Sequence, residues 1–102
     1  MSKYGNKRVT YFGNTFASGK EGKRYLVLRQ DEIDGTISGL ELQPKFKFEL
    51  CGVKICTYIA DFKYTTLQGD EIIEDVKGFK TDVYKLKKKL MKAFYGIEVF
   101  ET

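Results

Sequence analysis

A short glycine-containing turn, Leu67-Gln68-Gly69-Asp70, separates two largely apolar runs at 54–64 and 71–77. Both runs have the length and the β-branched and aromatic content of strands, so the turn predicts an antiparallel β-hairpin. If the hairpin is centred on the second turn residue, Asp61 lies opposite Asp75, with Cβ atoms about 4.5–5.5 Å apart on one face of the sheet. This register decides which polar side chains of the two strands can act together.

Two helices are predicted before and after these strands. Ser18-Gly19-Lys20-Glu21 matches a capping box, so a helix begins at this segment and ends at Gly35. A second helix begins at Thr81 and stops at Gly96. Its expected buried stripe consists of Val83, Leu86, Leu90, Ala93 and Phe94.

The remaining apolar segments complete the predicted sheet. Residues 9–16 suggest a small hairpin that turns at Gly13-Asn14. Residues 40–50 alternate between apolar and polar side chains, and residues 97–100 form a closing strand. The order is hairpin, helix, three strands, helix, strand, which predicts a single α/β domain over residues 1–102 with a mixed sheet flanked by helices.

Composition excludes several kinds of chemistry. The chain has no histidine, which removes serine–histidine and cysteine–histidine catalysis and the common zinc sites. The two cysteines, Cys51 and Cys56, are expected to be buried reduced thiols. No run approaches about 18 consecutive apolar residues, so we expect a soluble, cytoplasmic protein with no membrane partner.

The net charge of +4 is concentrated near the C-terminus of the sequence. Such a balance suits a polyanion, with nucleic acid first and an anionic membrane a distant second. A solvated, lysine-rich helix face is the alternative interpretation, and the sequence leaves both open. The lysines that recur at helical spacing, and are candidates to contact a DNA backbone, are Lys85, Lys88, Lys89 and Lys92.

Asp61 and Asp75 form a candidate metal site. Two bare carboxylates facing each other repel, and a hard divalent cation such as Mg²⁺ between them removes the conflict. Lys77 shares a face with Asp75, where a lysine can stabilise charge on a phosphoryl group or position the attacking water. Two surface acids and a surface lysine in a hairpin are the structural alternative.

Two further glutamates are ambiguous. Strict alternation points Glu74 into the core, unless a bulge turns it toward the metal, and only Asp75 shares a face with Lys77. Glu21 is already explained by the capping box, but a capping glutamate near the metal can also serve as a third acid.

Several segments of the chain together resemble a family of small, largely uncharacterised phage proteins placed in the PD-(D/E)XK nuclease superfamily. The segments are Lys3-Tyr4-Gly5-Asn6-Lys7, Phe16-x-Ser18-x-x-Glu21-x-x-Arg24-Tyr25, Leu40-Glu41-Leu42-Gln43-Pro44-Lys45-Phe46, Tyr58-Ile59-Ala60-Asp61-Phe62, Glu74-Asp75-Val76-Lys77-Gly78 and Thr81-x-x-Tyr84-x-Leu86-Lys87.

The resemblance implies a restriction-endonuclease-like fold with a defined set of site residues. Glu21, Asp61 and Asp75 would hold Mg²⁺ or Mn²⁺, and Lys77 would complete the catalytic set. Gln43 fits a position where some relatives place a glutamine near the phosphate. Ala60 stands where the motif has its proline, a residue that is often absent in relatives.

Together these features lead us to expect a divalent-metal-dependent DNA endonuclease of phage DNA metabolism, acting in the host cytoplasm as a homodimer. A chain of 102 residues has little room for a base-reading module, so recognition of branched DNA, such as Holliday junctions, or of DNA ends is expected. Two alternatives stay open. One is a catalytically inactive nucleic-acid-binding accessory protein of recombination or packaging, and the other is an interaction module kept soluble by its lysines.

Overall fold

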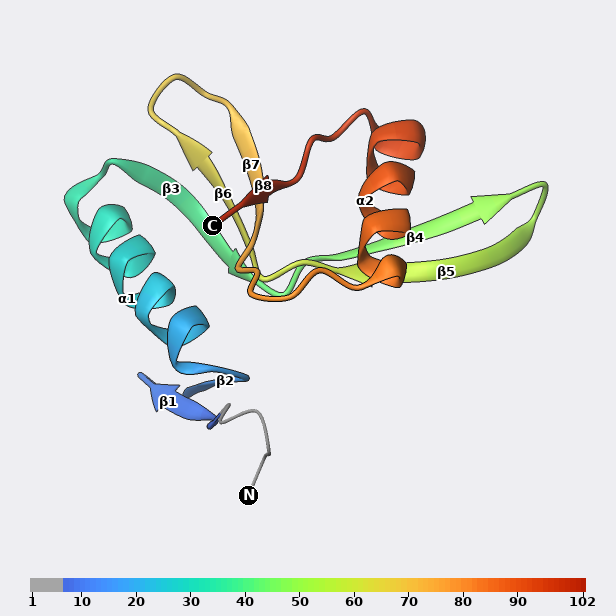
Figure 1. Ribbon diagram of the computed structural model, residues 1–102. Coiled ribbons are helices and arrows are strands. Elements are labelled where there is room, and N and C mark those ends of the chain that lie inside the picture. The colour runs from blue at the N-terminus through green and yellow to red at the C-terminus, as the bar shows by residue number, and fades with distance from the viewer. Residues whose placement is uncertain (1–6) are drawn as a thin grey trace.

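The computed structural model describes residues 7–102, so Lys3-Tyr4-Gly5-Asn6 of the first quoted segment lies outside the described residues. A four-stranded sheet of order β3-β6-β7-β8 lies between two helices (Figure 1). Its last pair is parallel and its other pairs are antiparallel, which confirms the predicted α/β fold with a mixed sheet flanked by helices. The elements are β1 (Val9–Tyr11), β2 (Asn14–Phe16), α1 (Gly19–Asp34), β3 (Ile37–Leu42), β4 (Lys45–Leu50), β5 (Val53–Ile59), β6 (Phe62–Thr66), β7 (Glu71–Asp75), α2 (Asp82–Tyr95) and β8 (Phe100–Glu101).

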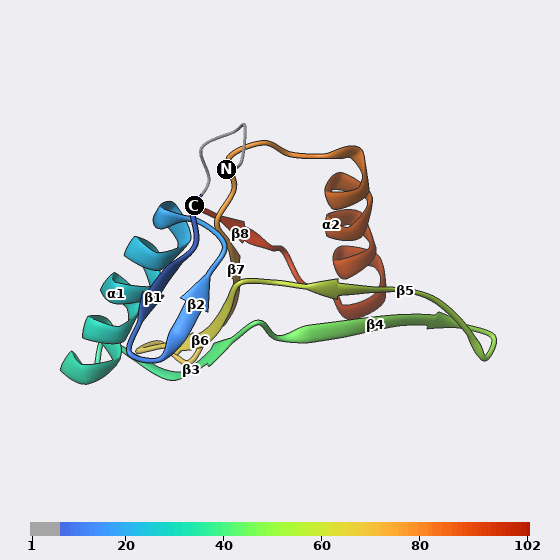
Figure 2. The ribbon, with the colours of Figure 1, turned by 90° about the horizontal axis from the view of Figure 1, so that it is seen from below.

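The two long strands predicted at 40–50 and 54–64 are each divided in two. The first becomes β3 and β4, and the second becomes β5 and β6, so that β4 and β5 form a separate hairpin that extends beneath α2 (Figures 1 and 2). The pairing nevertheless continues in one register, because the pairs Leu42↔Phe62 and Lys45↔Ile59 are separated by three residues on each side of the ladder. The two predicted strands are therefore the two sides of one bent antiparallel ladder.

The bend lies at Gln43-Pro44 on one side of the ladder and at Ala60-Asp61 on the other side. Gln43 adopts a left-handed backbone conformation with φ 53, which few non-glycine residues adopt. Its N–H donates to the Asp61 carbonyl at 3.0 Å, and the Ala60 N–H donates to the Pro44 carbonyl at 3.1 Å. The ladder thus turns without losing its hydrogen bonds, and Asp61 sits at the corner.

The predicted register of the β6–β7 hairpin is confirmed. Phe62 pairs with Glu74, and Thr65 pairs with Glu71. This register places Glu74 on the same face of the sheet as Phe62, and Asp75 on the opposite face. The β7 strand ends at Asp75, two residues earlier than predicted.

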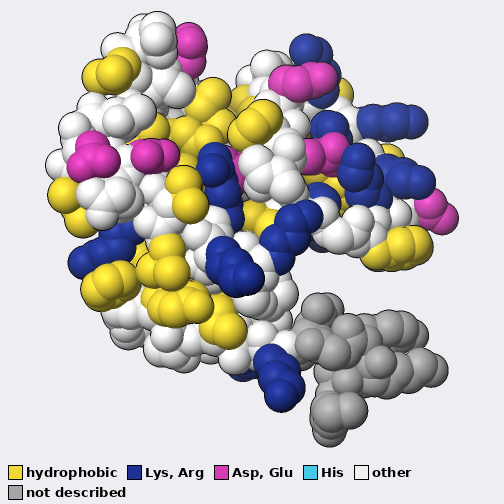
Figure 3. Space-filling model, turned by 60° about the vertical axis from the view of Figure 1, so that its left-hand side comes forward, with side chains coloured by type: hydrophobic (Ala, Val, Ile, Leu, Met, Phe, Trp, Pro, Cys, Tyr) yellow, Lys and Arg dark blue, Asp and Glu magenta, His cyan; other side chains and the backbone are white. Residues whose placement is uncertain are grey.

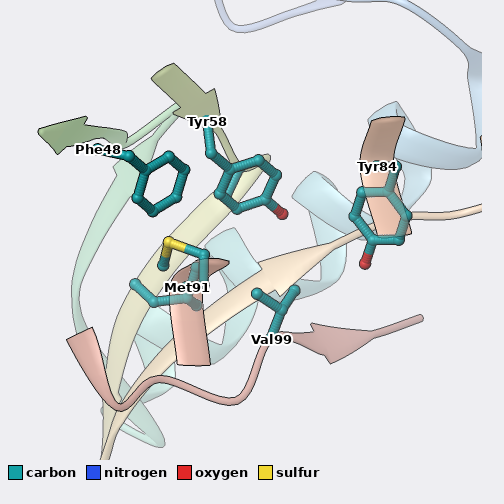
Figure 4. Packing of buried hydrophobic residues seen from close by; sticks show 7 residues of the cluster. Phe48, Tyr58, Tyr84, Met91 and Val99 are labelled. Carbon is teal, nitrogen blue, oxygen red and sulfur yellow. The ribbon is translucent and has the colours of Figure 1, made fainter. Parts of the chain in front are cut away.

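Two hydrophobic clusters lie on the two sides of the bent ladder. Alternation along a straight strand predicts that Tyr58 and Ala60 share a face with Phe62 and Tyr64. This prediction is wrong because the bend at Ala60 moves the two pairs into different clusters. The cluster near α1 contains Phe16, Tyr25, Leu28, Ile37, Phe62 and Tyr64. The cluster near α2, drawn in Figure 4, contains Phe48, Tyr58, Ala60, Ile73, Tyr84, Met91 and Val99.

Helix α1 begins and ends as predicted. The Ser18 hydroxyl accepts a hydrogen bond from the Glu21 N–H at 3.2 Å, and Gly35 ends the helix in a left-handed conformation. The β1–β2 hairpin packs on the first turns of the helix, where an added Cβ at Gly22 would lie 2.4 Å from a methyl carbon of Val9. The hairpin turn uses Phe12 and Gly13, one residue earlier than predicted, because both take the positive φ of a tight turn.

Helix α2 has the predicted caps, Thr81 and Gly96, but only part of the predicted buried face, since Leu90 packs against the core and the Phe94 ring contacts Phe48. Val83 and Leu86 are 62% and 57% exposed, and the buried residues are Tyr84 and Met91, two helical turns apart. The prediction failed because it counted apolar side chains alone. Tyr84 is favoured at the sheet since its ring is buried while its hydroxyl donates to Glu101 at 2.6 Å.

The closing strand and the cysteines also differ from expectation. The strand is β8, Phe100–Glu101, rather than 97–100, and it runs parallel to β7. Both cysteines are free thiols, but Cys51 is exposed because it lies in the turn between β4 and β5, and Cys56 is half-buried. Of the helices in the described part of the chain, neither is long and apolar enough to cross a membrane.

Candidate active site

The four predicted catalytic residues meet where the ladder bends. Glu21 comes from the first turn of α1, and Asp61 comes from the corner between β5 and β6. Asp75 is the last residue of β7, and Lys77 lies in the segment that follows this strand. Glu21, Asp61 and Lys77 line one cleft of about 580 Å³, whose wall also includes Lys20. Residues separated by more than fifty positions in the sequence are therefore gathered at one opening to solvent.

Asp61 is held by the backbone of the neighbouring strand. Its Oδ2 accepts the Val76 N–H at 2.7 Å. Burial is the largest cause that raises the pKa of the Asp61 carboxyl to about 8, and a hydrogen bond with Asp75 is the second. The hydrogen bond from the Val76 N–H acts in the opposite direction and lowers this pKa. The two aspartates therefore lie on the same side of the sheet, as the hairpin register requires.

Asp75 is the most enclosed of these acids, with a residue exposure of 1%. Its Oδ2 accepts the hydroxyl of Tyr58 and lies 3.3 Å from the Lys77 Nζ. Burial, helped by this hydrogen bond to Asp75, raises the pKa of Tyr58 well above its usual range. One oxygen of Asp75 thus has two protein partners.

Lys77 is positioned from two sides. Its Nζ lies 4.1 Å from the centroid of the Tyr84 ring, and its carbonyl accepts the Lys20 Nζ at 2.8 Å. A cation over an aromatic face is attracted by the ring's electrons, so α2 helps to hold this ammonium group beside Asp75. Its side chain keeps 24% of its surface exposed, so it can still reach a ligand in the cleft.

The carboxyl of Glu21 lies next to that of Asp61. Burial raises the pKa of Glu21, while a hydrogen bond with Asp61 lowers it. The residue is therefore more than a helix cap, because its side chain lies beside the corner aspartate.

Gln43 is also brought to the site. It lines a small pocket of about 120 Å³ together with Glu21 and Asp61, and it is the residue with the left-handed backbone at the bend. Unusual backbone conformations of this kind often occur at functional sites, where surrounding contacts hold them in place.

Glu74 has a different role from its neighbour Asp75. It is fully buried and forms a bidentate ion pair with Arg24, whose Nε and Nη2 lie 2.6 and 2.9 Å from its two carboxylate oxygens. It also accepts the hydroxyls of Tyr64 at 2.6 Å and Thr102 at 3.1 Å. Because four donors occupy its two oxygens on the far face of the sheet, the structure favours Asp75 over Glu74 as the candidate ligand.

The predicted DNA-contacting lysines line a second depression. Lys85, Lys88, Lys89 and Lys92 lie in a groove of about 470 Å³ between α2 and β8. Glu98 and Glu101 share this groove, so it is not uniformly positive. On one face of the molecule, lysine and arginine side chains gather in the middle and on the right, with acidic side chains among them (Figure 3).

The three carboxyl groups suit a hard divalent cation by their chemistry, since Mg²⁺ and Mn²⁺ prefer oxygen ligands. Glu21 and Asp75 each interact with Asp61, so one ion could be reached from all three. Among residues 7–102, however, no three acids or cysteines are already arranged as a metal-binding group. The donor set fits such an ion by type, and binding would require the side chains to close around it.

Comparison with known proteins places the chain in one family. The family described as "Protein of unknown function (DUF1064)" matches residues 1–99. The chain belongs to the DUF1064 family. No curated protein and no solved structure matches it significantly.

Two tyrosines of this DUF1064 protein lie at the site but were not among the predicted site residues. Tyr58 contacts Asp75, and Tyr84 contacts Lys77, although both tyrosines stand in segments quoted above for the resemblance. The sequence contains one indication for Tyr58, which stands only three residues before Asp61. Their roles depend on contacts between separate elements, which spacing alone does not reveal.

Proposed function

We propose that this DUF1064 protein is a divalent-metal-dependent DNA endonuclease of the PD-(D/E)XK type. The observation that carries the proposal is the pairing of the half-buried Asp61 with the buried Asp75, next to a cleft that Asp61 lines together with Glu21 and Lys77. Burying acids of like charge together is unfavourable, and such arrangements are concentrated at functional sites.

Each residue has a role that its position supports. Asp61, Asp75 and Glu21 would hold Mg²⁺ or Mn²⁺, which supplies a Lewis acid for a phosphoryl oxygen and a more acidic water. Lys77 places a positive charge at the cleft, where it can stabilise the negative charge that develops on the phosphate. Tyr58 and Tyr84 orient Asp75 and Lys77.

The charge around the cleft supports DNA as the substrate. Lys7, Lys20 and Lys77 line the cleft itself, and the lysines of α2 extend the positive surface along the neighbouring groove. Lysines spaced along a surface attract a phosphate backbone without reading its sequence. We therefore propose recognition of DNA shape, at branches or ends, with a second copy of the chain supplying the cut on the other strand.

A cleavage assay tests the proposal. Purified protein is incubated with supercoiled, linear, single-stranded and four-way-junction DNA in Mg²⁺, Mn²⁺ or EDTA. We expect cleavage with either metal, none in EDTA, and none from the Asp75→Asn variant. Cleavage that persists in that variant, or in EDTA, would contradict the proposal.

A DNA-binding protein without activity is the second candidate, and one observation favours it. The Oδ2 of Asp75 is already engaged by Tyr58 and Lys77, as expected of a site that has become structural. Asp61→Asn separates the two functions. An active enzyme loses cleavage and keeps DNA binding, whereas for an accessory protein the wild type also fails to cleave with any metal.

A further inference from the structure

We propose that the groove between α2 and β8 contains a second phosphate-binding site, in which the Glu101 carboxylate occupies the place of a phosphate group in the free protein. The inference rests on the proposed function in taking DNA as the ligand, and it concerns a phosphate other than the one cleaved. Its residues are Lys80, Tyr84, Lys85, Lys88, Lys89 and Glu101.

The carboxylate of Glu101 is surrounded by donors. Its Oε1 lies 2.9 Å from the Lys80 Nζ, and its Oε2 lies 3.4 Å from the Lys88 Nζ. Its Oε2 also accepts the Tyr84 hydroxyl at 2.6 Å. Two ammonium groups and a hydroxyl converging on one anion are the partners that a phosphate group takes in proteins.

The groove offers more positive charge than Glu101 uses. Lys85 and Lys89 line the same depression, and the salt bridges found within residues 7–102 do not involve them. A single carboxylate carries one negative charge, whereas a DNA strand brings a phosphate at each nucleotide. A strand lying in the groove would therefore replace Glu101 and also engage these two lysines.

The groove is connected to the candidate active site through Tyr84 and through the pairing of β7 with β8. Tyr84 donates its hydroxyl to Glu101, and its ring lies beneath the Nζ of Lys77. In the sheet, Glu101 is the direct partner of Asp75 across β7 and β8. A DNA strand bound in the groove would therefore lie next to Asp75. Glu101 competes with the phosphate of that strand, so it lowers the affinity of the free protein for DNA.

The test compares two glutamates of the same groove. Glu101→Gln removes the charge that holds Lys80 and Lys88, and Glu98→Gln removes the same charge from an exposed side chain that pairs with Lys92 at 3.5 Å. Binding of a fluorescent duplex to the full chain is measured by anisotropy in EDTA, so that no cleavage occurs.

We expect Glu101→Gln to bind about two- to fivefold more tightly than Glu98→Gln, the range of one exposed ion pair. In a background with both Lys80→Gln and Lys88→Gln, the two glutamate variants should bind alike. Equal affinities in the wild-type background, or weaker binding by Glu101→Gln, would overturn the proposal.

A second measurement covers the case in which Glu101→Gln does not fold. The Lys80→Gln/Lys88→Gln double variant changes two partly exposed side chains, and it should lower the slope of log K against log salt by about 1.8. An unchanged slope would overturn the phosphate site. Because these assays require no metal, an inactive protein can still pass them, and an active nuclease can still fail them.

Discussion

Glu74 and Asp75 are consecutive residues of β7, and their carboxylates lie on opposite faces of the sheet. Glu74 pairs with Arg24 of α1, whereas Asp75 lies near Asp61 and the Lys77 Nζ. The first carboxylate has its charge matched by a guanidinium and two hydroxyls. The second lies beside another acid, which is the arrangement that a bound cation would stabilise.

This difference predicts opposite effects of removing the two charges. Glu74→Gln should destabilise the protein by about 3 kcal/mol, because it breaks a buried ion pair and leaves Arg24 without its partner. Asp75→Asn should destabilise the metal-free protein by less than Glu74→Gln, because Asp75 lies beside another acid and its ion-pair partner Lys77 is partly exposed. Urea unfolding in EDTA measures both. Equal losses in the two variants would show that Asp75 is a structural acid as well.

The raised pKa of Asp61, about 8, predicts how stability depends on pH. An acid whose pKa is higher in the folded state keeps its proton there after the unfolded chain has lost it. The folded protein therefore binds more protons between about pH 4 and pH 8, and its free energy of unfolding falls as pH rises through that window.

Urea unfolding of the metal-free protein at pH 5, 6, 7 and 8 measures this dependence. Asp61→Asn should reduce the decline, and Asp70→Asn, at an exposed turn, should not. Mg²⁺ should bind more tightly as pH rises through the same window, since the ion must displace the proton of Asp61. Affinity for Mg²⁺ that is independent of pH would contradict the assignment of Asp61 as a ligand.

Lys77 is predicted to act on the reaction more than on the fold. Lys77→Ala should lower cleavage by about 100-fold or more, because its charge is needed where negative charge develops in the transition state. Thermal unfolding and Mg²⁺ titration should show folding and metal affinity largely retained, whereas Asp61→Asn and Asp75→Asn should lose metal affinity along with activity. Lys63→Ala, which removes a lysine from an exposed ion pair, is the control. Full activity of Lys77→Ala would exclude the proposed role.

Gly22 is predicted to fix the β1–β2 hairpin on α1. In Gly22→Ala the new methyl group would lie 2.4 Å from a side-chain carbon of Val9 and 2.8 Å from the Tyr11 ring. Overpacking of this kind costs about 1–3 kcal/mol. Gly19→Ala, in the same helix with no neighbour within 4 Å of the added carbon, should be neutral or stabilising, as measured by thermal unfolding. A Gly22→Ala variant as stable as Gly19→Ala would show that the hairpin packs loosely.

Local features of the sequence determined the helix boundaries and the register of the β6–β7 hairpin. Ser18 and Thr81 accept hydrogen bonds from backbone N–H groups three residues later, and Gly35 and Gly96 take the left-handed conformation that ends a helix. Each of these depends on neighbours within a few residues, which a single sequence displays. The turn at Gly69 likewise set which residues of the two strands face each other.

Only the tertiary structure decided which faces meet. The bend beside Asp61 sends Tyr58 and Phe62 into different clusters, and alternation along the chain continues unchanged through such a corner. Glu74 found its partner Arg24 fifty positions away. Helix α2 turned Tyr84 inward instead of Val83, because burying a ring whose hydroxyl reaches Glu101 combines apolar contact with a satisfied hydrogen bond. A helix carries apolar residues on several sides, and the partner that satisfies each one lies elsewhere in the chain.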